Sequence, residues 1–254
     1  MSRGLLGLAA AAALGLATCV ARAPDAAPGG GTPSLRVLVF SRTLGFRHDS
    51  IPDGVAALEA LGREHGFGVD STEDAGRFTP SNLARYRVVV FLSTTGEVLQ
   101  GAERDALRGF VRGGGGFVGV HSAADTLYDW PWYGALVGAY FARHPAVQPA
   151  ALRVEDASHP STRGLPDPWT WTDEWYDFRA SPRPEVHVLL AVDESSYHGG
   201  GMGADHPVAW YHAYDGGRAW YTALGHVREA YRDPAFRAHL LGGIAYAAGG
   251  AWPS

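Results

Sequence analysis

Residues 88–126 read VVVFLSTTGEVLQGAERDALRGFVRGGGGFVGVHSAADT, and their pattern decides the fold class. The run at 88–92 is entirely apolar, which is typical of a strand buried on both faces of a parallel sheet. Residues 103–112 have apolar side chains at helical spacing, and glycines end the segment. A second apolar strand is predicted at 117–120. A strand, a helix and a strand in this order indicate a βαβ unit.

The same alternation continues on both sides of this unit. Before it, the pattern predicts a strand at 35–40, a helix that begins after the N-cap Ser50, a strand at 67–71 and a short helix from Pro80. After residue 140, strands are predicted at 152–154, 186–192, 208–214 and 219–224, followed by a last helix at 234–248. The chain is therefore expected to be an α/β protein with a doubly wound parallel sheet.

Composition excludes several functional classes. The 254 residues are 46% apolar, which is enough for a sizeable core, and the net charge of −5 is spread without a basic stripe. Nucleic acid is therefore not an expected partner. All 21 basic residues are arginine, so a Schiff-base lysine and a P-loop lysine are excluded.

The N-terminus predicts export. Residues 1–23 read as a signal peptide, with a positive charge followed by an apolar run that is short for a membrane span. The stretch LATC resembles a lipobox, in which Cys19 would be lipidated, and 21–23 offers a rival A-x-A cleavage site. A Pro/Gly tether is expected at 24–34. The expected location is the periplasm, either free or as a membrane-anchored lipoprotein.

The single cysteine, Cys19, lies in this N-terminal segment, so no thiol is available in the expected folded domain at 35–250. Disulfides, thiolate zinc ligands and a cysteine nucleophile are thereby excluded from that domain.

Polar side chains follow several predicted strands at the point where each strand ends. In an open α/β sheet, ligands bind beyond the carboxyl ends of the strands. A single histidine at a strand end is more often packed than catalytic, but three on one edge favour a functional site. The side chains expected at this edge are His48, Thr94, Thr95, Gly96, His121, Asp125 and His226.

Further candidates lie among the aromatic residues of the C-terminal half. Trp and Tyr faces stack on the C–H surfaces of sugars, while nearby polar groups bind hydroxyls. The alternative is that these rings simply fill the core. The candidates are Trp132, His144, Asp173, Glu174, Tyr176, Asp205 and His206.

The chain resembles the ThuA-like family, named for trehalose utilisation. The likeness runs from residue 35 to 249 and is consistent with a single domain over 35–250. The stretches that carry it are GFRHDSI (45–51), VVVFLSTTGEVL (88–99), GGGFVGVHSAADT (114–126), WPWYGALVGAYFARHP (130–145), TDEWYDF (172–178), VHVLLAVDE (186–194), DHPVAWYHAYDGGRAWYTALGH (205–226) and DPAFRAHLLGGIAYA (233–247).

This resemblance implies a fold like that of class I glutamine amidotransferases, with a flavodoxin-like, mostly parallel sheet and helices on both faces. It also implies a role in the catabolism of trehalose and related disaccharides, including 3-keto intermediates. Residues 119–123 have the outline of a nucleophile elbow. The amidotransferases carry a cysteine nucleophile there, whereas this chain has His121. The likeness to them therefore stops at the fold, and glutaminase activity is not expected.

The leading hypothesis is an enzyme that hydrolyses or eliminates a glycoside or 3-keto-glycoside by acid–base chemistry. A 3-keto sugar has an acidic proton at C2, and histidine exchanges protons near neutral pH. The expected catalytic residues are His121, His48, Glu174, His144 and His226. The expected substrate-binding residues are Thr94, Thr95, Gly96, Asp125, Trp132, Asp173, Tyr176, Asp205 and His206.

Two alternatives remain open. The protein could be a metal-dependent sugar hydrolase or isomerase in which the same donors hold Zn²⁺ or another divalent ion, although no H-x-H or H-E-x-x-H pair supports this by spacing. The protein could also be a non-catalytic sugar-binding lipoprotein that feeds a transporter or a partner sugar dehydrogenase. In each case the expected partner is a small carbohydrate, and the membrane is contacted only through the signal peptide or a lipid anchor.

Overall fold

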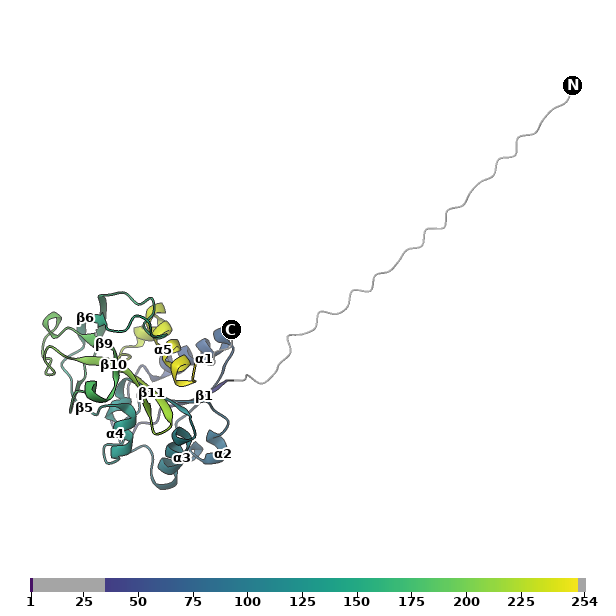
Figure 1. Cartoon of the computed structure of the whole chain (residues 1–254), viewed down its shortest axis with the longest axis horizontal. Coiled ribbons are helices and arrows are strands. Elements are labelled where there is room, and N and C mark those ends of the chain that lie inside the picture. The colour runs from purple at the N-terminus through teal and green to yellow at the C-terminus, as the bar shows by residue number, and fades with distance from the viewer. Residues whose placement is uncertain (2–34, 251–254) are drawn as a thin grey trace. The chain divides into compact units, whose positions relative to one another are not determined.

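The computed structural model describes Met1 and residues 35–250 (Figure 1). The predicted signal peptide, Cys19 and the predicted tether at 24–34 lie outside the described residues. Within the described part of the chain, no helix combines the length and apolarity needed to cross a membrane.

One nine-stranded sheet organises the fold, in the order β2-β1-β3-β4-β11-β10-β9-β6-β7. The first five strands of this order pair in parallel, and the other pairings are antiparallel. A separate two-stranded sheet pairs β5 with β8. The strands are β1 Arg36–Phe40, β2 Gly68–Thr72, β3 Val88–Leu92, β4 Gly116–Val120, β5 Phe141–Arg143, β6 Gln148–Val154, β7 Trp169–Asp173, β8 Asp177–Phe178, β9 His187–Val192, β10 Pro207–Tyr214 and β11 Gly217–Thr222.

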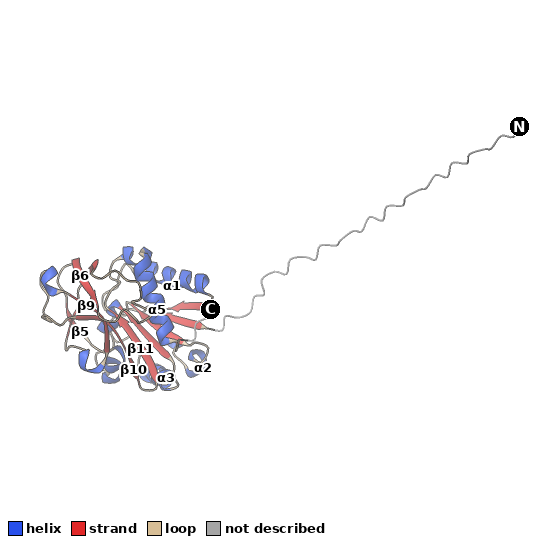
Figure 2. Cartoon of the chain, turned by 45° about the horizontal axis from the view of Figure 1, so that its top comes forward, coloured by secondary structure: helices blue, strands red, loops and turns tan. Residues whose placement is uncertain are grey.

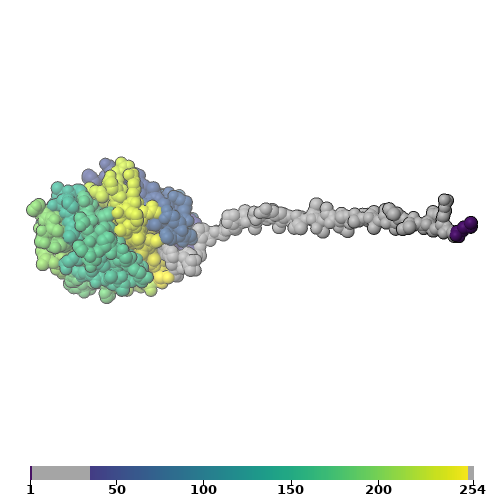
Figure 3. Space-filling model, turned by 90° about the horizontal axis from the view of Figure 1, so that it is seen from above, coloured from purple at the N-terminus to yellow at the C-terminus, as the bar shows by residue number. Residues whose placement is uncertain are grey.

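Helices cover both faces of the sheet (Figure 2). The α-helices are α1 Ile51–His65, α2 Pro80–Leu83, α3 Gly101–Arg112, α4 Pro131–Val137 and α5 Pro234–Ala247. In Figure 3 the yellow C-terminal segment lies on the surface beside the blue segment that contains α1. Ion pairs join the two segments, including Arg228 to Asp53 at 2.8 Å and Arg237 to Glu64 at 2.7 Å. The predicted α/β fold with helices on both faces is confirmed.

The βαβ unit predicted from residues 88–126 forms as β3, α3 and β4. Every residue of β3 and β4 is buried, as the continuous apolar runs indicate. Helix α3 begins two residues before the predicted start because Gln100 and Glu103 form a capping box. The glycines after α3 allow close approach. A Cβ on Gly116 would lie 2.3 Å from the carbonyl oxygen of Ala247 in α5.

Among the strands and α-helices of the C-terminal half, α4, β5, β7 and β8 were not predicted. Strand β7 has the sequence WTWTD, whose burial alternates between buried and exposed residues. This is the period of two expected of a strand with one covered face. Helix α4 is short and begins at Pro131, in the first turn where proline is tolerated.

The parallel part of the sheet determines where the site lies. The strands β1, β3, β4 and β11 all end at the same edge, and four polar segments follow them. The segments after β1 and β11 contain His48 and His226, respectively, and His121 directly follows β4. The side chains from these turns therefore converge, although more than 170 residues separate His48 from His226.

Candidate functional site

His121 sits on a sharp turn between β4 and a 3₁₀ turn, His121–Asp125. Its φ of +52° lies in the left-handed region, which is uncommon for a residue with a side chain. Gly119 leaves room for this turn, since a Cβ there would lie 2.9 Å from the ring of Tyr221. The Tyr221 hydroxyl also donates a hydrogen bond to the carbonyl oxygen of His121 at 2.8 Å. The strained backbone and its support present the imidazole above the sheet, as an elbow would.

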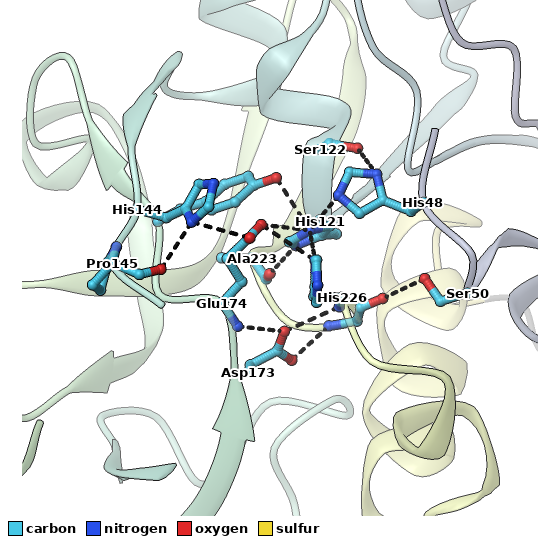
Figure 4. A network of polar contacts seen from close by, with 12 residues as sticks. His48, Ser50, His121, Ser122, His144, Pro145, Asp173, Glu174, Ala223 and His226 are labelled. Carbon is cyan, nitrogen blue, oxygen red and sulfur yellow. Dashed lines mark hydrogen bonds and ion pairs between the residues drawn. The ribbon is translucent and has the colours of Figure 1, made fainter. Parts of the chain in front are cut away.

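Three imidazoles and one carboxylate meet at a single point (Figure 4). His121 Nε2 lies 3.1 Å from His48 Nε2, 3.3 Å from His226 Nδ1 and 3.5 Å from Glu174 Oε2. His226 Nδ1 and Glu174 Oε2 are 3.2 Å apart. We call His48, His121, Glu174 and His226 the central cluster. These four residues could hold a metal ion, because imidazole and carboxylate are common ligands of transition metals.

Hydrogen bonds around the central cluster fix the orientation of two imidazoles. His121 Nδ1 lies 2.8 Å from the carbonyl oxygen of Ala223, so Nδ1 carries the proton and Nε2 presents its lone pair to the cluster. His48 Nδ1 lies 3.4 Å from the Ser122 hydroxyl. Ser122 was not among the predicted site residues, although it directly follows His121 in the sequence.

Burial controls the charge of His48. Desolvation, together with the imidazoles of His121 and His226, lowers the pKa of His48 to about 3. Because this value lies well below neutrality, His48 is uncharged at neutral pH, with a lone pair available on one ring nitrogen.

Glu174 joins the central cluster to a further histidine. Its Oε2 faces His121 and His226, while its Oε1 lies 3.0 Å from His144 Nδ1. Burial by itself raises the pKa of Glu174, but the contacts with His121 and His226 outweigh burial and lower it. Burial lowers the pKa of His226, and the hydrogen bond and charge of Glu174 reverse this and raise it. Glu174 is therefore ionised in this site.

Asp173 stabilises the backbone beneath the cluster. Its Oδ1 accepts hydrogen bonds from the backbone N–H of Glu174 at 2.9 Å and of His226 at 3.0 Å. Its Oδ2 accepts from the backbone N–H of Gly225 at 2.8 Å and from Trp171 Nε1 at 2.9 Å. The side chain is fully buried, so its oxygens serve the protein rather than a ligand.

Tyr176 closes the cluster on another side. Its hydroxyl lies 3.1 Å from His121 Nε2, and its ring lies beside His144 with a centroid separation of 6.0 Å. The backbone carbonyl of Tyr176 accepts a hydrogen bond from His206 Nε2 at 2.8 Å. His206 therefore supports Tyr176 from behind. Its Nδ1 lies 2.9 Å from Glu194 Oε1.

The structure thus brings together the five residues predicted to be catalytic, and Tyr176 with them. The remaining predicted residues have other partners. The hydroxyls of Thr94 and Thr126 are 2.8 Å apart, Thr95 Oγ1 accepts from Gly45 N–H and donates to the Phe46 carbonyl, and Gly96 N–H donates to the Asp125 carbonyl. The side chain of Asp125 accepts from the Tyr128 hydroxyl, Trp132 Nε1 donates to Asp215, and Asp205 pairs with Arg183.

A second group of donors, Asp177, Glu194 and His206, also lies within metal-binding range of one another. Arg143 Nη2 lies 2.6 Å from Asp177 Oδ2, and the Glu194 carboxylate accepts from the backbone N–H of Met202 at 2.7 Å. These groups already have partners within the protein.

Comparison with known proteins supports the fold and identifies the family. Two ThuA-like proteins of known structure are similar over 87% of this chain, each with a TM-score of 0.72. The protein from Bacteroides uniformis is 25% identical with 94% of its chain covered, and the one from Parabacteroides merdae is 20% identical with 92% covered.

A cytoplasmic protein of Salmonella typhimurium shares the fold at 12% identity, with a TM-score of 0.60 over 84% of this chain and 99% of its own. No curated protein matches the chain. The sequence model of the ThuA family, described as trehalose utilisation, matches residues 36–247. This match covers most of the chain, and we conclude that the protein belongs to the ThuA family.

Proposed function

We propose that this protein is an enzyme of carbohydrate metabolism that hydrolyses or eliminates a glycoside or keto-glycoside by moving protons on its sugar. The observation that carries the proposal is the pairing of His144 with Glu174 at the edge of the central cluster. Membership of a family described as trehalose utilisation supports a carbohydrate substrate.

His144 has the arrangement expected of a proton-transfer group. Its side chain is 39% exposed, whereas that of Glu174 is buried, so the pair reaches from the buried centre to solvent. His144 Nδ1 faces two acceptors, Glu174 Oε1 at 3.0 Å and the Pro145 carbonyl at 2.8 Å. The Nδ1 therefore carries the proton, and Nε2 is left with the lone pair that can accept a proton from a substrate.

The keto form of a sugar suits this group chemically. A carbonyl acidifies the proton on the adjacent carbon, and loss of that proton permits departure of a neighbouring glycosidic oxygen. The reaction needs a base for the proton and a polar centre for the charge that develops on the carbonyl oxygen. His144 would supply the base, and once protonated on Nε2 it would return that proton to the departing glycosidic oxygen. The Tyr176 hydroxyl, which lies beside the central cluster, would donate a hydrogen bond to the carbonyl oxygen.

An exposed aromatic ring beside the cluster is consistent with a sugar ligand. The side chain of Phe46 is 66% exposed, and its ring meets that of His48 edge to face at 4.8 Å. The loop that carries Phe46 is held by Thr95, whose hydroxyl bonds both Gly45 and Phe46. An exposed ring on this anchored backbone offers a surface for the C–H face of a sugar.

The test is turnover. Incubation with trehalose, sucrose and their 3-keto forms, followed by NMR, should show product formation, and His144→Gln should lower kcat by at least about 100-fold. His198→Gln is the matched control, because His198 is exposed and bonds through its backbone. Binding of these sugars without turnover would contradict the proposal and favour a sugar-binding protein.

Export is part of the same proposal and rests on the N-terminal sequence at 1–23. An exported enzyme of this kind would receive its keto-sugar from a partner dehydrogenase. Intact mass measurement of the mature protein from its native host tests the location: lipidation at Cys19 or cleavage near residue 23 is expected, and an unprocessed N-terminus would refute export.

A further inference from the structure

The nitrogen and oxygen atoms that meet in the central cluster carry more lone pairs than hydrogen bonds between them can satisfy. His121 Nε2 has one lone pair, because the proton of this ring is on Nδ1 beside the Ala223 carbonyl. Four polar atoms nevertheless lie within 3.5 Å of this nitrogen, on His48, Tyr176, His226 and Glu174. One lone pair accepts one hydrogen. The remaining lone pairs need a common partner, and a metal cation can accept several lone pairs at once.

The spacing of the donors agrees with coordination. At a bond length of about 2.1 Å, neighbouring ligand atoms lie about 3.0 Å apart in octahedral and about 3.4 Å apart in tetrahedral geometry. The separations within the cluster are 3.1 Å for His48 to His121, 3.3 Å for His121 to His226, 3.2 Å for His226 to Glu174 and 3.5 Å for His121 to Glu174. All four donor atoms lie within 4.8 Å of one another.

The surroundings of the cluster are those of a supported metal site. Metal-binding histidines usually donate their second nitrogen to a carbonyl, hydroxyl or carboxylate, which fixes the ring. His121 does so with the Ala223 carbonyl, and His48 faces the Ser122 hydroxyl. Asp173 ties the backbone of Glu174 to that of His226, so these two ligands are held at a fixed separation.

We propose that one divalent transition-metal ion binds between four side chains: His48, His121, His226 and Glu174. Three nitrogens and one oxygen favour zinc, or a neighbouring first-row metal, over magnesium and calcium, which prefer oxygen ligands. A bound ion of this kind would polarise an oxygen of the substrate. His144 faces Glu174 Oε1, whereas the central cluster uses Glu174 Oε2, so His144 stays outside the ligand set.

The second group of donors, Asp177, Glu194 and His206, is not proposed as a metal site. Asp177 faces the Arg143 guanidinium at 2.6 Å, and a cation there would meet a positive charge. The Glu194 Oε1 that faces His206 Nδ1 at 2.9 Å also accepts a hydrogen bond from the backbone N–H of Met202 at 2.7 Å. Asp177→Asn is therefore expected to leave the metal content unchanged.

The experiment measures binding rather than activity. The untagged chain is freed of metal with a chelator, then titrated with ZnCl₂ by calorimetry and analysed by elemental mass spectrometry. One zinc per chain is expected, with no comparable binding of Mg²⁺. Co²⁺ is expected to give the visible absorption bands of a site with nitrogen and oxygen ligands.

Variants locate the ion. His226→Ala and Glu174→Gln should each weaken zinc binding by about 100-fold or more. Replacing even a residue that only supports a ligand typically lowers metal affinity by about 10- to 100-fold. His144→Gln should retain one zinc per chain. Circular dichroism and thermal melting verify that each variant is folded.

The outcomes separate this inference from the proposed function. No stoichiometric binding of Zn²⁺ or Co²⁺ by the wild-type chain would overturn the metal site. Binding that persists in both folded ligand variants would also overturn it. A chain that binds zinc in this way but converts none of the sugars would refute the proposed function and leave the metal site standing.

Discussion

Asp173 is the residue whose replacement tests the architecture of the site most directly. Its two carboxylate oxygens accept four hydrogen bonds, from the backbone of Glu174, Gly225 and His226 and from the ring of Trp171. Asp173→Asn keeps the shape of the side chain and replaces one oxygen with an NH₂ group. Each carboxylate oxygen accepts two of the four hydrogen bonds, so in either orientation of the amide the NH₂ group replaces the acceptor of two N–H groups.

The expected loss of stability follows from this count. Hydrogen bonds to a charged group contribute about 1.5–3 kcal/mol each, so losing two of them lowers the free energy of unfolding by about 3–6 kcal/mol. For a domain of this size, each kcal/mol corresponds to about 2–4 °C in the melting temperature, and a fall of at least about 6 °C is expected. The zinc affinity should fall as well, because Glu174 and His226 are no longer tied to each other.

The assay is urea unfolding followed by tryptophan fluorescence, with a thermal melt as a second measurement. Asp205→Asn is the matched control. It makes the same chemical change in an ion pair with Arg183 at the surface, where Asp205 is half exposed. Exposed pairs contribute little, so the control should lose less than about 1 kcal/mol. An Asp173→Asn protein within about 1 kcal/mol of the wild type would refute the reasoning.

Two further predictions concern stability. Gly116→Ala should destabilise the protein by at least about 1–3 kcal/mol, because its Cβ would lie 2.3 Å from the Ala247 carbonyl oxygen. Gly109→Ala lies inside α3, where a Cβ would meet no described atom within 4 Å beyond its chain neighbours and the backbone of the helix, and should stabilise the protein by about 0.5–1 kcal/mol. Equal effects of the two substitutions in urea unfolding would contradict this. Burial lowers the pKa of His239 to about 4, from 6.5 for an ordinary histidine. The unfolded chain binds this proton first, so stability is intact above pH 6.5 and falls by up to about 3 kcal/mol as the pH drops towards 4. His239→Gln should flatten that part of the stability profile, and an unchanged slope would show that His239 is not the cause.

Local patterns account for the parts of the fold that were predicted. The apolar run at 88–92 and the glycines after α3 act within a few residues, and they identified the βαβ unit. The edge of the sheet was also predictable, because parallel strands of one sheet end on the same side. Three of the four members of the central cluster, His48, His121 and His226, were expected from this rule alone.

The partners of individual side chains were not predictable in the same way. Thr95 lies at the expected edge, yet its hydroxyl holds the loop of Gly45 and Phe46. Strand β7 was not predicted, because its two tryptophans fit an irregular segment between strands as well as they fit a strand. Its position in the sheet depends on antiparallel pairing with β6, which a loop of 14 residues separates from it.

The contrast is sharpest between Asp173 and Glu174. The sequence by itself determined that two acids follow one another among aromatic residues, and it determined the fold class and the histidines at the strand ends. Only the tertiary structure decided that Asp173 turns inward to four N–H groups while Glu174 meets three histidines. The reason is physical: strand ends are specified by local hydrophobic pattern, whereas the direction of a side chain and its partners are specified by packing between segments that, for these two acids, lie up to about 50 residues apart.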